Sequence, residues 1–276
     1  MAGKKIIILP LLIIPVIIVS LTSLFYFDIL PLIIPPSNIL STVSFLFPIL
    51  GVFLMEILGL ILVYQMWSQR DRLKAKFGNL AYQKILYVGL IGVTIIIITA
   101  IHNVVFIFVQ KNLSWSNVLY SLFIFPLTSY IPTSVDVFLF IRMIIGIGCF
   151  IIGVSIMIRS VFTFGIDYMM VLYLYFPEES EIQNHKIYSI LRHPAYAAAI
   201  VISLGGMILQ LNLYSISFFI LIYLTFYFHI HYVEEKELIE RFGPSYMDYK
   251  KKVRAFFVRI KDFGKLLAFV IGKNKS

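Results

Sequence analysis

The chain has 276 residues, of which 60% are hydrophobic and 13% are charged. In a soluble domain roughly 25% of residues are charged, so this composition excludes a soluble globular protein and indicates an integral membrane protein. The net charge of +9 does not indicate a nucleic-acid partner, because Lys and Arg gather where the apolar runs stop. That placement is typical of contacts with anionic lipid headgroups in a bilayer.

Six apolar runs are long enough to cross a membrane as helices. They cover residues 6–27, 41–67, 85–109, 137–162, 194–211 and 214–232. We therefore predict an all-α fold, a polytopic membrane helix bundle with about six transmembrane helices. A further apolar segment, 115–130, contains Pro126 and is short for a crossing, so we place it at the outer face.

The polar segment after the second apolar run predicts the orientation of the chain. Its basic residues are Arg70, Arg72, Lys74, Lys76 and Lys84. Cytoplasmic loops of membrane proteins are enriched in Lys and Arg, so we predict that this loop and both termini are cytoplasmic. The pattern does not distinguish the plasma membrane from the endoplasmic reticulum.

The chain becomes polar on one face after the last apolar run. Gly243 and Pro244 are typical of the end of one helix and the first position of the next. From 245 to 257, apolar residues recur at three- and four-residue steps opposite a basic face, which predicts an interfacial amphipathic helix. We divide the chain into a four-span bundle (1–165), a region with the last two spans and this helix (166–260), and a basic tail (261–276).

The last two apolar runs form a hairpin that we expect to turn at Asn212, and two polar clusters flank it. One is the segment Arg192-His193-Pro194-Ala195-Tyr196, and the other is the pair Glu234-Glu235. A hairpin that crosses the membrane twice returns to the side where it began, so we expect both clusters to face one ligand. Pro194 suits the start of a helix, whose free N–H groups favour an anion.

The second cluster also has structural interpretations. Two adjacent carboxylates at the end of a span could form a solvated helix end, with Lys236 as a neighbour. A metal site is not predicted, because His229 and His231 would point about 200° apart on a helix.

Glu56 and Arg142 lie within the apolar runs, where placing a charged side chain in the membrane costs free energy. Such groups are candidates for function, although Arg142 could also extend to the outer surface. Gly205 and Gly206 keep one face of the fifth run shallow, which would let another helix or a flat ligand approach.

The two clusters belong to a pattern that extends over about seventy residues. It reads Ile187-Tyr188, Leu191-Arg192-His193-Pro194-Ala195-Tyr196, then Glu234-Glu235-x-x-Leu238-x-x-x-Phe242-Gly243-x-x-Tyr246-x-x-Tyr249-x-x-x-Val253. This pattern resembles the isoprenylcysteine carboxyl methyltransferase family, and related phospholipid methyltransferases share much of it. The first half of the chain matches nothing beyond a membrane bundle.

The resemblance implies an enzyme that holds S-adenosyl-L-methionine in a cytoplasm-facing pocket and takes a lipophilic acceptor from the bilayer, without a metal. Methyl transfer of this kind needs positioning and exclusion of water. The cofactor-binding residues that the resemblance implies are Ile182, Gln183, Tyr188, His193, Pro194, Ala195, Tyr196 and Glu234.

Two positions depart from the family pattern and leave the acceptor open. Ile230 replaces the Arg that holds the substrate carboxylate, and Lys186 replaces a Gly. For a carboxylate acceptor such as a prenylated cysteine, we predict that Arg192 holds the carboxylate. For an amine acceptor, as in phosphatidylethanolamine methylation, His231 or Glu235 would act as the base.

Two other function classes fit parts of the pattern. Membrane sterol reductases have a similar C-terminal arrangement and would bind NADPH, but beyond Arg192 and Lys186 we find no clear basic cluster for its 2′-phosphate. A non-enzymatic membrane scaffold would not need the polar residues of both clusters. Binding of S-adenosyl-L-methionine or of NADPH discriminates these classes, and the oligomeric state is not predicted.

Overall fold

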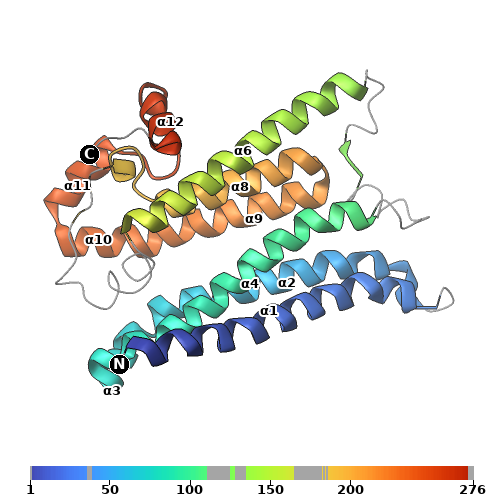
Figure 1. Ribbon diagram of the computed structural model, residues 1–276, viewed down its shortest axis with the longest axis horizontal. Coiled ribbons are helices and arrows are strands. Elements are labelled where there is room, and N and C mark those ends of the chain that lie inside the picture. Colours follow the sequence, from blue (N-terminus) through green and yellow to red (C-terminus); the bar gives the residue numbers. More distant parts are fainter. Residues whose placement is uncertain are drawn as a thin grey trace. The chain divides into compact units, whose positions relative to one another are not determined.

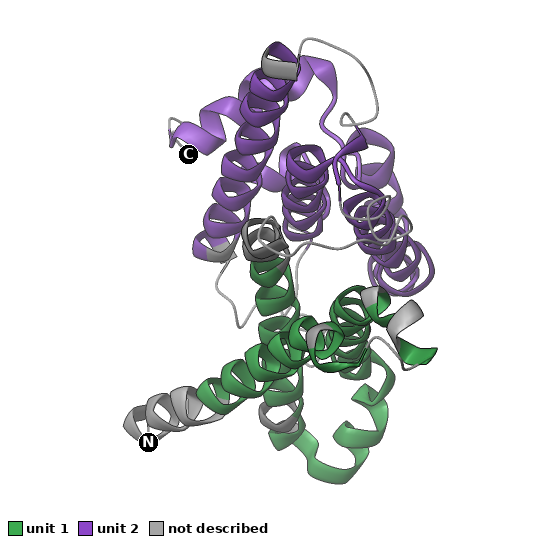
Figure 2. Ribbon diagram, turned by 90° about the vertical axis from the view of Figure 1, so that its right-hand side faces the viewer, with its two compact units in different colours: residues 1–124 green, residues 125–276 purple. Residues whose placement is uncertain are grey.

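The computed structural model describes residues 2–35, 39–110, 125–127, 135–164, 182, 184 and 186–272. The chain divides into two compact units, residues 1–124 and 125–276 (Figure 2). Within the described residues the regular elements are helices, with one isolated backbone bridge between Leu191 and Arg254. The predicted all-α fold is confirmed.

Three long helices make up most of the first unit: α1 (Ala2–Ile33), α2 (Phe47–Ser68) and α4 (Ala81–Gln110) (Figure 1). The shorter elements are η1 (Ile39–Thr42), η2 (Ser44–Leu46), α3 (Arg70–Phe77) and η3 (Gly78–Leu80). Gly59 and Gly92 allow α2 and α4 to approach, because a Cβ atom at Gly92 would lie 2.8 Å from the Gly59 carbonyl oxygen. Asp28 Oδ2 lies 2.7 Å from His102 Nε2 and joins α1 to α4.

The two ionisable residues of the apolar runs lie in different units. Glu56 is fully buried on α2, and its carboxylate oxygens have no hydrogen-bond partner among the described residues. Arg142 is half-buried on α6 (Val135–Phe164). Their role as candidates for function therefore stays a prediction.

The second unit is built on three helices that lie side by side, α6, α8 (Pro194–Gln210) and α9 (Leu213–His229) (Figure 1). The hairpin between α8 and α9 turns at Asn212, as predicted. The Asn212 side chain accepts a hydrogen bond of 2.8 Å from the Ser215 N–H, and the Asn212 N–H donates to Ser215 Oγ at 3.2 Å. This reciprocal capping fixes where α9 begins.

Gly205 and Gly206 differ in how closely other atoms approach them on α8. A Cβ atom at Gly205 would lie 2.8 Å from the Gly146 carbonyl oxygen of α6, whereas one at Gly206 would meet nothing within 4 Å. We expect Gly205→Ala to lower the free energy of unfolding by about 1–3 kcal/mol, because the backbone of α6 must move. Thermal unfolding in detergent would measure the loss.

Gly206→Ala is the matched control for this prediction. It adds the same methyl group to the same helix in open space, so it should leave stability unchanged or raise it by up to about 1 kcal/mol through helix propensity. Equal destabilisation by both substitutions would contradict the close approach of α6 and α8.

The C-terminal part differs from the predicted single amphipathic helix. A π-helical turn, Ile230–Glu234, continues α9 into α10 (Glu235–Phe242). Gly243, at φ +55°, ends α10, and Pro244 begins α11 (Pro244–Lys252), as predicted. The helix predicted over 245–257 is wrong beyond Lys252, because Val253 is extended and the chain pairs there with another segment.

The segment expected as a basic tail contains further helix. It comprises η9 (Ile260–Asp262) and the apolar helix α12 (Phe263–Ile271). Leu266 and Phe269 of α12 are buried in the core of the second unit, and the Arg159 guanidinium of α6 lies 5.9 Å from the Phe269 ring. Apolar contacts therefore hold this segment against the helices.

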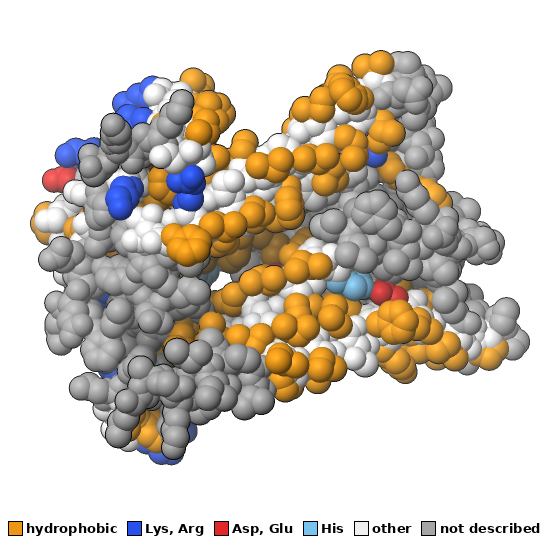
Figure 3. Space-filling model, viewed as in Figure 1, with side chains coloured by type: hydrophobic (Ala, Val, Ile, Leu, Met, Phe, Trp, Pro, Cys, Tyr) orange, Lys and Arg blue, Asp and Glu red, His pale blue; other side chains and the backbone are white. Residues whose placement is uncertain are grey.

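Five described helices are long and apolar enough to cross a membrane, over 13–31, 47–68, 85–102, 137–160 and 213–242. The sixth predicted span is α8, an apolar helix of 17 residues. Apolar side chains cover much of the visible described surface, and Lys and Arg gather beside α11 and α12 (Figure 3). The chain is an integral membrane protein; the predicted 115–130 segment lies largely outside the described residues.

Candidate functional site

The start of α8 is held by the chain that follows α11. The Arg192 N–H donates to the Arg254 carbonyl at 2.9 Å, and the His193 N–H donates to the Ala255 carbonyl at 3.2 Å. These bonds and the Leu191–Arg254 bridge bring residues about sixty positions apart into register. The first polar cluster is thereby fixed to the C-terminal segment as well as to the hairpin.

Arg192 and Glu235 form a buried ion pair at this junction. Arg192 Nε donates to Glu235 Oε1 at 2.9 Å, and Nη2 bonds the same oxygen. Arg192 Nη1 donates to the carbonyls of Lys250, at 3.0 Å, and Val253. Lys250 Nζ lies 2.7 Å from the other carboxylate oxygen, Oε2. Arg192 therefore ties three segments together, and its donors point into the protein.

His193 links the two predicted clusters. Its Nδ1 lies 3.3 Å from Glu234 Oε1, its Nε2 lies 3.5 Å from Glu235 Oε1, and 4% of its side chain is exposed. Burial lowers the pKa of His193, but the charge of Glu234 and hydrogen bonding to Glu234 and Glu235 outweigh burial. The pKa of His193 therefore lies above its ordinary value, which favours the imidazolium beside two carboxylates.

The π-helical turn places both carboxylates beside one imidazole. On an α-helix adjacent residues point about 100° apart, yet Glu234 and Glu235 both approach His193. The turn Ile230–Glu234 ends at the first residue of this pair, and such wide turns are frequent at functional sites. Residue types alone carry no signal for the turn.

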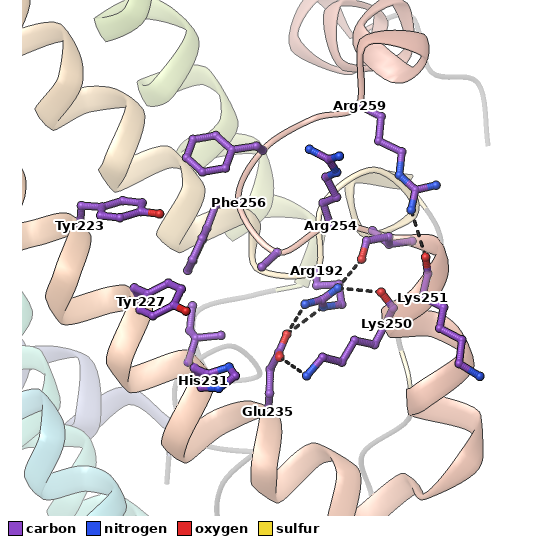
Figure 4. Close-up of a pocket in the computed structure, with 14 residues that line it drawn as sticks. Arg192, Tyr223, Tyr227, His231, Glu235, Lys250, Lys251, Arg254, Phe256 and Arg259 are labelled. Atoms are coloured by element: carbon purple, nitrogen blue, oxygen red, sulfur yellow. Dashed lines mark hydrogen bonds and ion pairs between the residues drawn. The ribbon is translucent and has the colours of Figure 1, made fainter.

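A cavity of about 450 Å³ lies beside this cluster (Figure 4). Tyr223, Tyr227 and His231 line one side from successive turns, with the Tyr227 and His231 rings stacked at 5.9 Å. The other side comes from the C-terminal segment, including Phe256 and Phe257. The structure therefore forms an aromatic cavity with Arg192 and Glu235 at its polar end (Figure 4).

The predicted site residues separate into two neighbouring groups. The predicted catalytic residues Arg192, His231 and Glu235 all line the cavity. His193 and Glu234 form the adjacent buried cluster, where the Tyr196 ring lies 6.0 Å from that of His193. Because Glu235 contacts both groups, the two regions share one wall.

The remaining predicted cofactor residues have different settings. Pro194 and Ala195 open α8, where the His193 side chain does not cap the helix. The Tyr188 carbonyl accepts a hydrogen bond from Tyr249 Oη at 2.6 Å. Ile182 is half-buried, and Gln183 lies outside the described residues.

Several lining residues were not predicted from the sequence. Tyr223 and Tyr227 precede His231 at four-residue steps, a spacing that puts them on one helix face and could have identified them. The sequence predicts a helix that includes Arg254, Phe256 and Phe257. They line the cavity because the chain leaves the helical path at Val253.

Comparisons with known proteins find relatives for the region of the chain that carries this site. Residues 141–245 match the family model described as phospholipid methyltransferase. A probable protein-S-isoprenylcysteine O-methyltransferase of Oryza sativa subsp. indica is 28% identical over 112 residues, which cover 40% of this chain and 58% of the rice protein. The chain thus spans less than two thirds of the rice relative.

A yeast protein matches over a shorter stretch at higher identity. The protein-S-isoprenylcysteine O-methyltransferase of Saccharomyces cerevisiae is 40% identical over 67 residues, which cover 24% of this chain and 28% of the yeast protein. No solved structure gives a significant match. Residues 141–245 therefore resemble the phospholipid methyltransferase family, and the predicted resemblance to isoprenylcysteine methyltransferases is confirmed.

Proposed function

We propose that this chain is an S-adenosyl-L-methionine-dependent methyltransferase that acts on a lipophilic acceptor at the membrane. The acceptor chemistry would be most like that of a protein-S-isoprenylcysteine O-methyltransferase, with residues 166–260 carrying the site. The observation that carries the proposal is the contact of Glu234 with His193 at the start of α8, directly beside an aromatic cavity. The family match over residues 141–245 supports it.

The buried cluster suits the cofactor chemically. Glu234 Oε2 is buried and accepts no hydrogen bond from a described residue, so it is available to a ligand cation or hydroxyl. The uncapped start of α8 favours the carboxylate of the same ligand. When bound, the cofactor supplies a methyl group on a sulfonium, whose transfer is driven by the cofactor itself. His193 and Glu234 would hold and orient that ligand.

Among the predicted catalytic residues, the contacts favour different roles. Arg192 and Glu235 use their donors and acceptors on each other, on Lys250 and on backbone carbonyls, so we assign them to positioning. His231 lines the cavity on a helix face that continues into the apolar span. The aromatic wall would guide a lipophilic acceptor toward the polar end and exclude water from it.

His231 also supports a second candidate, phospholipid N-methylation of the phosphatidylethanolamine type. An amine acceptor must lose a proton before it attacks, and the His231 imidazole lines the cavity near Glu235. The description of the matching family model fits this alternative as well. A carboxylate acceptor would already be a nucleophile and would need no base.

We further propose that the site and both termini face the cytoplasm. The support is the basic segment at α3, which predicts a cytoplasmic loop between the second and third spans. Under that orientation the cofactor would enter from the cytoplasm and the acceptor from the bilayer. Cysteine labelling from either side of sealed membranes would test this placement.

The activity is tested with purified protein in detergent or nanodiscs. We expect titration calorimetry to show binding of S-adenosyl-L-methionine and none of NADPH. With the methyl-labelled cofactor, label should pass to acetyl-farnesylcysteine as a base-labile ester or to phosphatidylethanolamine as a base-stable amine. Binding of NADPH without the methyl donor would instead support the reductase class.

A further inference from the structure

The cavity is strongly basic at its polar end. Among the described residues that line it, one is a carboxylate, Glu235. The cationic lining residues are Arg192, Lys250, Lys251, Arg254 and Arg259. An aromatic cavity with an excess of positive charge attracts an amphiphile whose head is anionic.

Most of these cations already have partners. Arg192 and Lys250 are paired with Glu235, and Lys251 Nζ lies 3.0 Å from Asp248 Oδ1. Arg259 Nη2 donates to the Lys251 carbonyl at 3.0 Å. These cations are held by the protein, so they are less available to a ligand.

Arg254 differs from them. Its side chain is exposed, lines the cavity, and makes no hydrogen bond or ion pair with a described residue. Its backbone is fixed by the bridge to Leu191 and by the Arg192 N–H. Figure 4 shows the Arg254 guanidinium pointing away from the Arg192–Glu235 pair. A free guanidinium on a fixed backbone is suited to bidentate binding of a carboxylate or phosphate.

We propose that Arg254 holds the anionic head of the acceptor while its apolar part lies along Tyr223, Tyr227 and Phe257. This inference rests on the proposed function, because it assigns the head-group contact of the same acceptor site. Ile230, which lines the same cavity from the hairpin side, is buried and offers no charge. Arg254 supplies a charge from the C-terminal segment.

The test measures binding of three ligands with the same farnesyl chain, by calorimetry in detergent. Acetyl-farnesylcysteine carries a carboxylate, farnesyl phosphate carries a phosphate, and farnesol is neutral. In Arg254→Gln we expect binding of at least one anionic ligand to weaken roughly 10- to 100-fold, the range for a lost charge-assisted hydrogen bond. Farnesol binding should not change, and the ligand that weakens identifies the head group.

Two variants serve as controls. Lys252→Gln removes the same charge from an exposed side chain that does not line the cavity, so binding should stay at the wild-type value. Arg254→Lys keeps the charge and should retain more anion binding than Arg254→Gln. The proposal is overturned if Arg254→Gln binds both anionic ligands as wild type does, or loses farnesol equally.

The same measurements distinguish failure of the proposed function from failure of the Arg254 proposal. A wild-type protein that binds anionic farnesyl ligands through Arg254 but does not bind S-adenosyl-L-methionine would keep the anion site and reject the methyltransferase. Intact binding of S-adenosyl-L-methionine with no preference for the anionic ligands over farnesol would support the methyltransferase and reject the anion site at Arg254.

Discussion

Arg192→Ala should lower the free energy of unfolding by about 3–5 kcal/mol, because it leaves a buried carboxylate without its main partner. Glu235 is 4% exposed and receives two of the Arg192 donors, while the third donor group bonds carbonyls of the C-terminal segment. Thermal or denaturant unfolding of the purified protein in detergent would measure the loss. Arg192→Lys should give an intermediate loss, since an ammonium cannot reach all of these acceptors.

The matched control is Lys236→Ala on the neighbouring helix. Its ammonium lies 4.0 Å from Glu240 and both side chains are largely exposed, so the change should cost at most about 1 kcal/mol. If Arg192→Ala were as stable as the control, the structural role of Arg192 would be wrong. Its predicted role as the holder of an acceptor carboxylate would then regain support.

Glu234→Gln should weaken binding of S-adenosyl-L-methionine roughly 10- to 100-fold, since a charge-assisted hydrogen bond contributes about 1.5–3 kcal/mol. The substitution keeps the shape of the side chain but removes the charge from an oxygen that no described residue occupies. It also removes the negative charge that lies beside His193 Nδ1. Titration calorimetry of the methyl donor would measure the change.

Glu237→Gln provides the comparison, because Glu237 pairs with Arg241 on α10 and does not contact His193. It removes the same charge three residues further along, and cofactor binding should remain at the wild-type value. Unchanged binding in Glu234→Gln would move the cofactor site away from the buried cluster. The aromatic cavity would then become the candidate for it.

The sequence allowed the helices to be predicted because their cause is local. Long apolar runs must form helices in a membrane, and Asn212, Gly243 and Pro244 mark ends that the structure confirms. The pattern also identified His193, Glu234 and Glu235 as neighbours, because a hairpin returns its two ends to one side.

What could not be predicted depends on contacts between distant segments. Val253 has the spacing of an amphipathic helix, but its neighbours pair with the backbone before α8, and this pairing ends the helix. The sequence predicts that Arg192 binds a ligand carboxylate, because a charge in a sequence does not reveal its partner within the protein. The carboxylate and carbonyls that it binds lie 43 to 61 residues away. The wide turn that ends at Glu234 likewise has no local sequence signal.

The pairing of residues 191–193 with 254–255 has a consequence for how the protein is made. The described spans of the second unit all precede residues 254–255 in the sequence. While the ribosome is still translating these residues, the earlier helices can already be inserted in the membrane, yet the cavity lacks one wall. Assembly of the site is therefore a late event in biogenesis, because its last wall docks only after the C-terminal segment has left the ribosome.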